Sequence, residues 1–391
     1  MVTIVSGVDV FAHLVGQPEA VASLRAAASG TGMTHAWLFT GPAGSGRSVA
    51  ARSFAAALQC VSKPVGCGTC RGCHMVQTGN HPDVRFVVPE GLSIPVALMR
   101  ELVMRAATTP ATGRWQILIV EDADRLTEAA GNALLKAVEE PPERTVFLLC
   151  APSDHPDDVP LTIRSRCRVV TLRQPSPDAV ADLLMSRDGI PAELAAMVAS
   201  AAQGHVGRAR RLARDPEART RRAAVLAVPR QLSSVGAAFD AANGLISAAE
   251  AESDAATAEI DAVERAEMET ALGAGGTGKG AAGAVRGAAG QLKELERRQK
   301  SRATRAQRDA LDRALLDLAG FYRDVLANQW AAPVRAIHSD VHAVAQAAAE
   351  RWSPESTLRR LEAVMQCRTA IDANVKPRIA VEAMMLSLWK G

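Results

Sequence analysis

The sequence of 391 residues contains few aromatic side chains and no strong excess of either charge. Phe, Trp and Tyr together make up 3% of the chain, which leaves few rings on which nucleic-acid bases could stack. Lys plus Arg number 45 and Asp plus Glu number 42, so the formal net charge is only +3. This composition gives no support for a disordered chain or a nucleic-acid-binding tail, and abundant alanine favours helix-rich packing.

Long apolar runs are also missing. No stretch approaches the ~18 apolar residues of a membrane helix. Residues 1–17 lack the cationic segment and long apolar run of a signal peptide. We therefore expect a cytoplasmic protein. The length predicts two or three domains, because single hydrophobic cores stop growing at about 250 residues.

Strands alternate with helical segments in residues 1–174. The strand candidates are residues 36–41, 84–88, 115–122, 145–151 and 168–172. Continuous apolar runs of this kind are typical of parallel strands that are buried on both faces of a sheet. The pattern predicts a three-layer α/β domain with a parallel sheet.

Two helices in this domain have recognisable ends. Ser93 is the expected N-cap of a helix with Pro95 in its first turn. Thr127 is the expected N-cap of another helix, which should end before Pro141-Pro142 because proline cannot continue a helix.

Helical patterns occupy the rest of the chain. Residues 175–217 predict a small helical module, and residues 218–391 predict an all-helical domain. The Gly/Ala-rich residues 273–290 should be flexible. Acidic residues before this segment and basic residues after it predict an antiparallel helical hairpin over 248–310, with two independent solvated helices as the alternative. The sequence leaves the role of this hairpin, including contact with DNA, undecided.

Residues 41–48, GPAGSGRS, match the phosphate-loop pattern G-x4-G-K-[ST] at every defining position except the lysine. The loop follows a strand and precedes a helix, where glycines let backbone N–H groups close around phosphates and the helix N-terminus adds positive charge. Arg47 replaces the lysine with a longer, planar cation, and Ser48 would ligate magnesium. The nucleotide-site candidates are Gly41, Gly44, Gly46, Arg47, Ser48, Glu121 and Asp122.

The acidic pair at the end of the 115–122 strand is Glu121-Asp122, whereas a working ATPase usually has Asp-Glu there. Both carboxylates remain, but the longer and the shorter side chain have exchanged positions. The positioning of magnesium is sensitive to such changes. We expect a degenerate site that can bind ATP or ADP with Mg²⁺ but does not hydrolyse ATP by itself. The alternative is an empty loop retained from the fold.

Four of the seven cysteines lie within fourteen residues, in a segment where glycines permit tight turns. They are Cys60, Cys67, Cys70 and Cys73. Four thiolates close a tetrahedral zinc site, which predicts a structural rather than a catalytic Zn²⁺. The alternatives are reactive thiols or a redox pair. A DNA-binding finger is disfavoured, because Lys63 and Arg71 are the only cations of the insertion.

Several segments together resemble bacterial clamp-loader subunits of the AAA+ class, over residues 8 to about 215. They are Val15-Gly16-Gln17, residues 35–42 (HAWLFTGP), the cysteine insertion after the phosphate-loop helix, residues 132–142 (NALLKAVEEPP) and Ser165-Arg166-Cys167. The resemblance implies an AAA+ core over 1–174 with a zinc module at 60–73, a helical lid over 175–217 and a helical collar for oligomerisation over 218–391. It also implies that Arg166 is an arginine finger that acts in trans on a neighbouring ATPase subunit.

The departures from the motor pattern favour a delta-prime-type member of this family. Motor subunits have lysine where this chain has Arg47, Asp-Glu where it has Glu121-Asp122, and a sensing arginine at the position of Gly207, one residue before Arg208. The implied partners are gamma/tau-type motor subunits and a delta subunit in a pentameric loader of the DNA polymerase III holoenzyme, and indirectly the sliding clamp and primed DNA. Two alternatives stay open: a gamma/tau-like ATPase motor and a passive ring scaffold.

Overall fold

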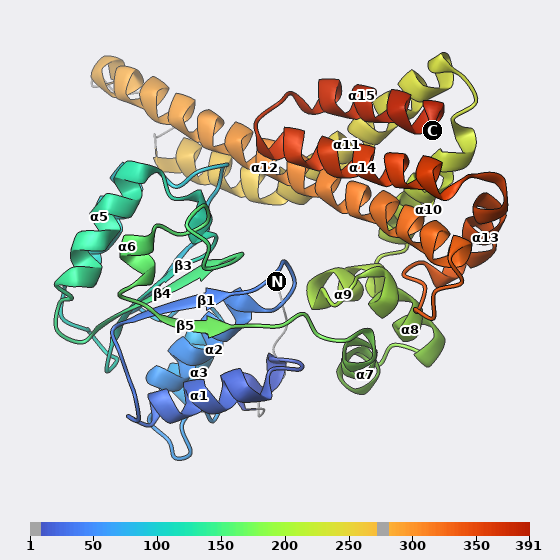
Figure 1. Ribbon diagram of the computed structural model, residues 1–391. Coiled ribbons are helices and arrows are strands. Elements are labelled where there is room, and N and C mark those ends of the chain that lie inside the picture. Colours follow the sequence, from blue (N-terminus) through green and yellow to red (C-terminus); the bar gives the residue numbers. More distant parts are fainter. Residues whose placement is uncertain (1–8, 272–280) are drawn as a thin grey trace. The chain divides into compact units, whose positions relative to one another are not determined.

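The computed structural model describes residues 9–271 and 281–391 of the chain (Figure 1). These residues fall into two compact units, Met1–Ala213 and Arg214–Gly391. The first unit contains the sheet, and the second is built from helices alone in its described part. The finer division of the chain at residues 174 and 217 stays a prediction.

The first unit contains a five-stranded parallel sheet in its described part. The strands are β1 (Ala36–Thr40), β2 (Val84–Val87), β3 (Gln116–Val120), β4 (Thr145–Ala151) and β5 (Arg168–Thr171). They lie in the order β2-β3-β4-β1-β5, so β2 and β5 are the edge strands. Arg85 and Arg168 are exposed on these two edges. The predicted parallel α/β sheet is confirmed.

Helices cover both faces of the sheet (Figure 1). Trp37 and Phe39 of β1 point to one face and Leu38 points to the other, as successive residues of a strand must. The first face is covered by η1 (Val10–His13), α1 (Pro18–Ala28), α2 (Arg47–Leu58) and α3 (Arg71–Gln77). The second face is covered by α4 (Val96–Ala106), η2 (Ala123–Arg125), α5 (Glu128–Glu139) and α6 (Leu161–Arg164).

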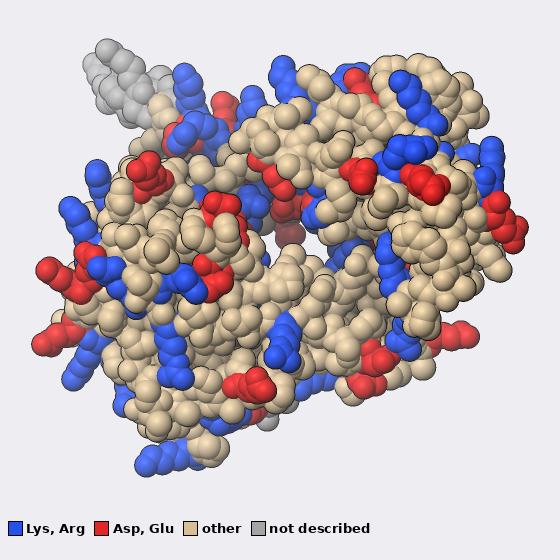
Figure 2. All heavy atoms as spheres, viewed as in Figure 1, with Lys and Arg blue, Asp and Glu red and all other residues tan. Residues whose placement is uncertain are grey.

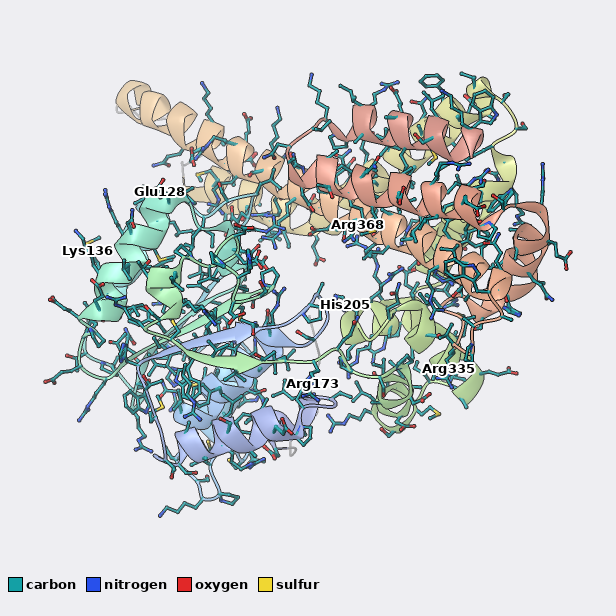
Figure 3. The ribbon with its side chains drawn as sticks, viewed as in Figure 1. Glu128, Lys136, Arg173, His205, Arg335 and Arg368 are labelled. Carbon is teal, nitrogen blue, oxygen red and sulfur yellow. The ribbon has the colours of Figure 1, made fainter. Side chains whose placement is uncertain are left out.

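Helix α5 begins and ends where the sequence predicts. The hydroxyl of Thr127 accepts a hydrogen bond from the backbone N–H of Ala130 at 3.3 Å, as an N-cap does. Glu128 lies in its first turn and Lys136 in its last, so both charges complement the helix dipole (Figure 3). The helix ends at Glu139, before the two prolines.

The predicted start of helix α4 is wrong. Its N-cap is Pro95, and Ser93 lies two residues earlier, outside the helix. Between them, the backbone N–H of Ile94 donates to the carbonyl of Arg125 at 2.7 Å, and Ile94 forms a parallel bridge with Leu126. This pairing keeps the chain extended before Pro95, so the helix cannot start at Ser93.

Three helices complete the first unit: α7 (Pro177–Asp188), α8 (Ala192–Ala201) and α9 (Val206–Arg214). The chain between β5 and α7 is fixed by Gln17. The side-chain amide of Gln17 donates to the carbonyl of Arg173, and its oxygen accepts from the backbone N–H of Arg173 at 3.1 Å. The Val15-Gly16-Gln17 segment thus anchors the connection between the sheet and these helices.

The second unit is a helical bundle. Its helices are α10 (Pro216–Gln231), α11 (Val235–Ala271), α12 (Ala281–Gln329), η3 (Ser339–Val341), α13 (His342–Arg351), α14 (Pro354–Asp372) and α15 (Pro377–Lys390). Leu311, Leu315 and Tyr322 of α12 are fully buried in its core, against residues of the other helices. The predicted all-helical C-terminal part is confirmed.

Helices α11 and α12 form the predicted antiparallel hairpin. Arg302 contacts Asp261 at 2.7 Å and Glu264 at 2.8 Å, and further along Arg313 contacts Glu252 at 2.7 Å. Basic side chains of one arm therefore meet acidic side chains of the other. Part of the segment expected to be flexible, residues 272–280, lies outside the described residues. From Ala281 onward the chain is helical. The flexibility expected for residues 273–290 stays a prediction.

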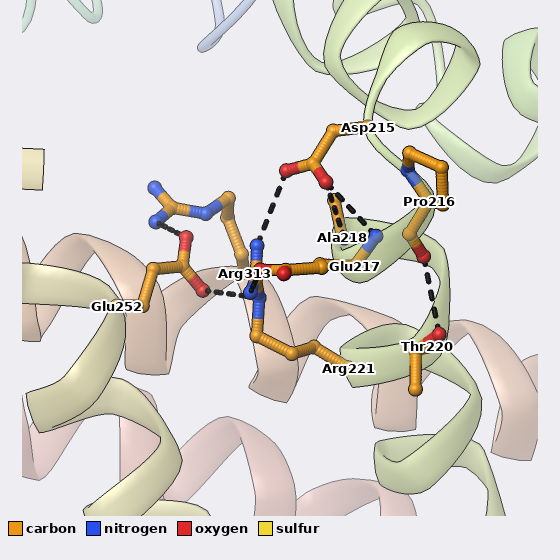
Figure 4. A network of polar contacts seen from close by, with 8 residues as sticks. All are labelled: Asp215, Pro216, Glu217, Ala218, Thr220, Arg221, Glu252 and Arg313. Carbon is orange, nitrogen blue, oxygen red and sulfur yellow. Dashed lines mark hydrogen bonds and ion pairs between the residues drawn. The ribbon is translucent and has the colours of Figure 1, made fainter. Parts of the chain in front are cut away.

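A polar network fixes the start of α10 to this hairpin (Figure 4). The Asp215 carboxylate accepts hydrogen bonds from backbone N–H groups of the first turn of α10 and contacts Arg221 at 3.2 Å. Glu252 lies between two arginines, at 3.6 Å from Arg221 and 2.7 Å from Arg313. The first turns of α10 are thereby tied to both arms of the hairpin.

Charged side chains of both signs share the surface. Lys and Arg are interspersed with Asp and Glu over the face that Figure 2 shows, in line with the small net charge. Among the described residues, no helix has both the length and the apolar character needed to cross a membrane.

Candidate functional site

The four clustered cysteines converge on one point. The Sγ atoms of Cys60, Cys67, Cys70 and Cys73 all lie within 4.8 Å of one another. Two of the separations are 3.7 Å (Cys60 to Cys67) and 3.9 Å (Cys60 to Cys70). Four sulfurs placed ~2.3 Å from a tetrahedral zinc ion are roughly 3.8 Å apart, so the donor set fits that ion in size, chemistry and number. The cluster can hold a metal ion such as zinc.

Local hydrogen bonds favour the thiolate form at one of these cysteines. Burial raises the pKa of Cys67, but hydrogen bonds from the Thr69 hydroxyl and the Cys70 backbone N–H outweigh it and lower that pKa to about 5. Burial raises the pKa of Cys73 well above its usual range. A buried thiol of this kind becomes a ligand when a cation compensates the charge of its thiolate.

The cysteine module is docked tightly onto the rest of the unit. The backbone N–H of Val10 donates to the carbonyl of Gly66 at 3.0 Å. A Cβ at Gly72 would lie 2.4 Å from the carbonyl oxygen of Gln59, so only glycine fits there. The Gln59 side chain in turn accepts from the backbone N–H of Arg114 at 2.9 Å. The module is therefore coupled to α2 and to the loop before β3.

The phosphate loop lies between β1 and α2, as the sequence predicts. Gly44 and Gly46 have positive φ angles of 86° and 93°, which glycine adopts without strain. The Ser45 hydroxyl oxygen and one Arg47 guanidinium nitrogen, Nη1, are buried without a hydrogen-bond partner among the described residues. These donors lie next to the N-terminus of a twelve-residue helix, an arrangement that suits an anion.

The acidic pair lies close to Arg47. Strand β4 separates β1 from β3, and Cys150 near its end is paired with Phe39 of β1. Burial, together with the charge of Glu121 at the end of β3, raises the pKa of Cys150 far above its usual range, and Arg47 lowers it. Arg47 and Glu121 are therefore both within electrostatic reach of Cys150. The phosphate loop and the acidic pair meet at the carboxyl edge of the sheet.

Asp124 also belongs to this site, although the sequence motif indicated only Glu121 and Asp122. Its Oδ1 is buried without a hydrogen-bond partner among the described residues. Burial and the neighbouring Asp122 raise the pKa of Asp124, and Arg47 acts in the opposite direction. The signal in the sequence is the third carboxylate of Glu121-Asp122-Ala123-Asp124. Its burial beside Arg47 follows from the turn of η2 and could not be read from the pattern.

His205 closes over the phosphate loop, a second contact that the sequence did not indicate. A Cβ at Gly44 would lie 2.6 Å from both Cα and Cβ of His205, which precedes α9 (Figure 3). Gly204 adopts a φ of +81°, and a Cβ there would lie 2.5 Å from the carbonyl oxygen of Pro175. The Nδ1 atom of His205 accepts from the backbone N–H of Arg208 at 3.3 Å. The helices after β5 thus contact the loop directly.

Replacing Gly44 with alanine should destabilise the first unit by about 2 kcal/mol or more, because a positive φ and a contact with His205 backbone both oppose a Cβ. Gly244→Ala is the matched control. Gly244 lies within α11 and has nothing within 4 Å of an added Cβ, so alanine there should stabilise by about 0.5–1 kcal/mol. Urea unfolding of both variants measures the difference. Equal stability of the two would contradict the contact between His205 and the loop.

The Ser165-Arg166-Cys167 segment forms the turn between α6 and β5. The Arg166 side chain is 39% exposed. Its Nη1 donates to the carbonyl of Thr162 at 2.9 Å and contacts the Ser165 hydroxyl at 3.2 Å. Its Nη2 lies 2.7 Å from a carboxylate oxygen of Glu139, at the end of α5. Burial raises the pKa of the Cys167 thiol to about 12, so this cysteine is a packing residue.

The two arginines beside Arg166 have separate structural partners. Arg164 contacts Asp154 at 2.7 Å. Arg168 donates to the carbonyl of Gly32 at 2.7 Å, and its guanidinium stacks over the Trp37 ring at 4.9 Å. Arg164 is thereby tied to the loop after β4, and Arg168 to the segment before β1 and to Trp37 of β1.

Arg166 and the phosphate loop lie at opposite edges of the sheet. β1 and β5 are parallel, with Trp37 opposite Arg168 and Thr40 opposite Thr171. Arg166 precedes β5, at the amino edge, whereas the phosphate loop follows β1, at the carboxyl edge. Strands of this length separate the two edges by roughly 10–15 Å. The structure thus brings the phosphate loop, the acidic pair and Asp124 together, and keeps Arg166 apart from them.

Comparison with known proteins places these features in a family. Residues 16–176 match the family model described as DNA polymerase III, delta subunit. The delta' subunit of DNA polymerase III from Bacillus subtilis is 34% identical over 197 residues, or 50% of this chain and 58% of that protein. The delta' subunit from Pseudomonas aeruginosa is 37% identical over 164 residues, or 41% of this chain and 48% of that protein.

A tau/gamma subunit matches a similar length of the chain. The tau/gamma subunit of DNA polymerase III from Haemophilus influenzae is 34% identical over 203 residues, or 50% of this chain and 29% of that protein. The matched region thus spans between 29% and 58% of the length of these three relatives. Residues 16–176 therefore match the DNA polymerase III delta-subunit family, and the chain is similar to bacterial delta' and gamma/tau subunits of DNA polymerase III.

Proposed function

We propose that this chain supports ATP-dependent loading of a sliding clamp onto primed DNA by supplying Arg166 to the nucleotide site of a neighbouring gamma/tau-type ATPase subunit. The observation that carries the proposal is the placement of Arg166. It is partly exposed on a turn at the amino edge of the sheet, whereas the chain's own phosphate loop is at the carboxyl edge. An arginine so placed can meet a phosphate of another subunit but not one held in its own loop.

The guanidinium of Arg166 would act on the charge of the transferred phosphoryl group. A cation that contacts the γ-phosphate stabilises charge that develops in the transition state, and such arginines are worth roughly 10³–10⁵ in rate. Through the same contact, Arg166 would sense whether ATP is bound to the neighbouring subunit. With gamma/tau-type motor subunits and a delta subunit completing a five-membered ring, the completed site would favour the form that opens the clamp and grips primed DNA.

The chain's own loop would bind ATP or ADP without turning it over. The N-terminus of α2 and Arg47 would hold the phosphates, Ser48 would ligate Mg²⁺, and Glu121 and Asp122 would face the metal. Bound Mg²⁺ supplies charge neutralisation at the phosphates. Arginine in the lysine position and the exchanged acidic pair both oppose hydrolysis by this chain alone.

The cysteine module would hold a structural Zn²⁺ through Cys60, Cys67, Cys70 and Cys73. Four thiolates leave no open position for substrate, so the ion would supply a crosslink and no reaction chemistry. The module lies against α2, which begins with Arg47 and ends at Leu58, two residues before Cys60. Its role would be to fix the far end of the helix that starts at the phosphate loop.

The purified chain should show no steady-state ATP turnover, and a mixture with its gamma/tau-type subunit should show turnover that depends on this chain. Phosphate release, measured with the clamp and primed DNA present, distinguishes the proposed function from a self-sufficient motor and from a passive scaffold. Robust turnover by the chain alone would support the second candidate, a gamma/tau-like motor; the chain is 34% identical to a tau/gamma subunit as well as to a delta' subunit. Binding of neither nucleotide nor zinc, with no effect on the mixture, would point to a passive ring scaffold.

A further inference from the structure

Arg166 is held back against its own subunit by three contacts. Nη1 reaches the carbonyl of Thr162 and the hydroxyl of Ser165, both within the turn that carries Arg166. Nη2 contacts the Glu139 carboxylate at 2.7 Å, from the end of a different helix. Glu139 is the only anionic partner that the described residues offer to this guanidinium.

The position of Glu139 is fixed and is unfavourable for its own helix. It is the last residue of α5, where backbone carbonyls already concentrate negative charge, so a carboxylate there does not stabilise the helix. The preceding carbonyl, of Val138, contacts Nε2 of His35 at 2.9 Å, and two prolines follow Glu140. These contacts fix the backbone at the end of α5, and the contact of the Glu139 carboxylate in the structure is Arg166.

We propose that Glu139 is a positioning residue that docks the arginine finger, and that the γ-phosphate of a neighbouring subunit must replace its carboxylate as the partner of Arg166. This inference rests on the proposed function of Arg166. The ligand exchanged for Glu139 is the terminal phosphate of a nucleoside triphosphate, since an anion with several acceptor oxygens can satisfy the fork of a guanidinium. The ion pair with Glu139 would thus compete with the γ-phosphate for Arg166 and weaken the neighbour's apparent affinity for ATP.

The expected effect is modest because the pair is partly exposed. The side chains of Arg166 and Glu139 are 39% and 40% exposed, and ion pairs in such positions contribute little once solvent screens them. Removal of the Glu139 charge should therefore tighten the neighbour's apparent binding of ATP by about twofold to fivefold. This tighter binding should be measurable as a lower KM for ATP, with kcat unchanged.

The test compares Glu139→Gln with Glu140→Gln, a neighbouring exposed carboxylate with the same change of charge. In the full chain, reaction of Arg166 with phenylglyoxal, followed by mass spectrometry, reports release of the guanidinium without any need for a partner. In the complex with the gamma/tau-type subunit, KM for ATP and kcat are measured separately. Glu139→Gln should speed modification of Arg166 and lower KM by about twofold to fivefold at unchanged kcat, and Glu140→Gln should do neither.

The outcomes separate the two proposals. If Arg166→Ala lowers the ATPase of the complex but Glu139→Gln leaves KM and phenylglyoxal modification unchanged, the finger stands and the role of Glu139 is overturned. If Arg166→Ala leaves the ATPase unchanged, the finger and the exchange at Glu139 are both overturned, whatever the modification rate. The double variant Glu139→Gln/Arg166→Ala should match Arg166→Ala alone, and any further effect of Glu139→Gln in that background also contradicts the exchange.

Discussion

Arg166→Ala is expected to lower ATP turnover at the neighbouring site by about 10³-fold while the variant chain folds and assembles normally. The expectation follows from the loss of a cation where charge develops in the transition state. Folding should be unaffected, since the Arg166 side chain is 39% exposed and its ion pair with Glu139 contributes little in water. Steady-state ATPase of the assembled complex, with clamp and primed DNA present, measures the effect, and size-exclusion chromatography confirms assembly.

Arg164→Ala provides the matched control for this measurement. Arg164 lies two residues away, is 43% exposed and contacts Asp154 at 2.7 Å, so its loss removes an equal charge from the same turn. The ATPase of the Arg164→Ala complex should stay near that of the unmodified complex. Equal losses in both variants would mean that the turn contributes only general positive charge, and normal stimulation in Arg166→Ala would remove the finger assignment.

Cys73→Ala is expected to abolish stoichiometric zinc and to destabilise the first unit by roughly 3–5 kcal/mol. Cys73 is fully buried, so water cannot replace the missing thiolate, and the three remaining sulfurs would leave an open coordination position. The cost should stay below the about 10–16 kcal/mol of a zinc finger that folds only with its metal. Here the module also docks through Gly66, Gly72 and Gln59.

Cys367→Ala is the control for the zinc experiment. Cys367 is equally a buried cysteine, but it lies in the core of the second unit and is not one of the four clustered thiols. This variant should keep one zinc per chain by elemental analysis and unfold with only a small loss of stability. A chelator should lower the thermal stability of the unmodified chain and leave Cys73→Ala unchanged. Stoichiometric zinc in Cys73→Ala would contradict the four-thiolate site.

Much of the fold could be predicted because its determinants are local. The apolar run at 145–151 gives the bounds of β4, and Thr127 with the two prolines gives those of α5. The start of α4 could not be predicted in this way. It depends on the pairing of Ile94 with Leu126, which lies far along the sequence, and local capping residues do not reveal such a pairing. Opposite charges on the two arms likewise predicted the hairpin, but not that Arg302 would contact Asp261 and Glu264.

The residues of the candidate site also fall into those that local sequence predicts and those that it does not. The glycines of the phosphate loop and the cysteine spacing are contiguous motifs, so they could be read from the sequence. Asp124, His205 and Glu139 come to their sites only through the strand order and the packing of helices around it. His205 and Glu139 contact a residue that the motifs had already identified, and Asp124 lies within electrostatic reach of one, Arg47. Tertiary structure thus adds the partners of the motif residues, which the linear pattern does not contain.

The two edge strands have a consequence for how the protein avoids aggregation. Strands β2 and β5 span four residues each, and exposed Arg85 and Arg168 lie on them. An unpaired edge invites a strand from another molecule, but a short edge that carries a charge resists such pairing. The open sides of this sheet are therefore poor templates for intermolecular β-structure. At the high concentrations of overexpression, substitution of these arginines by valine would remove that protection.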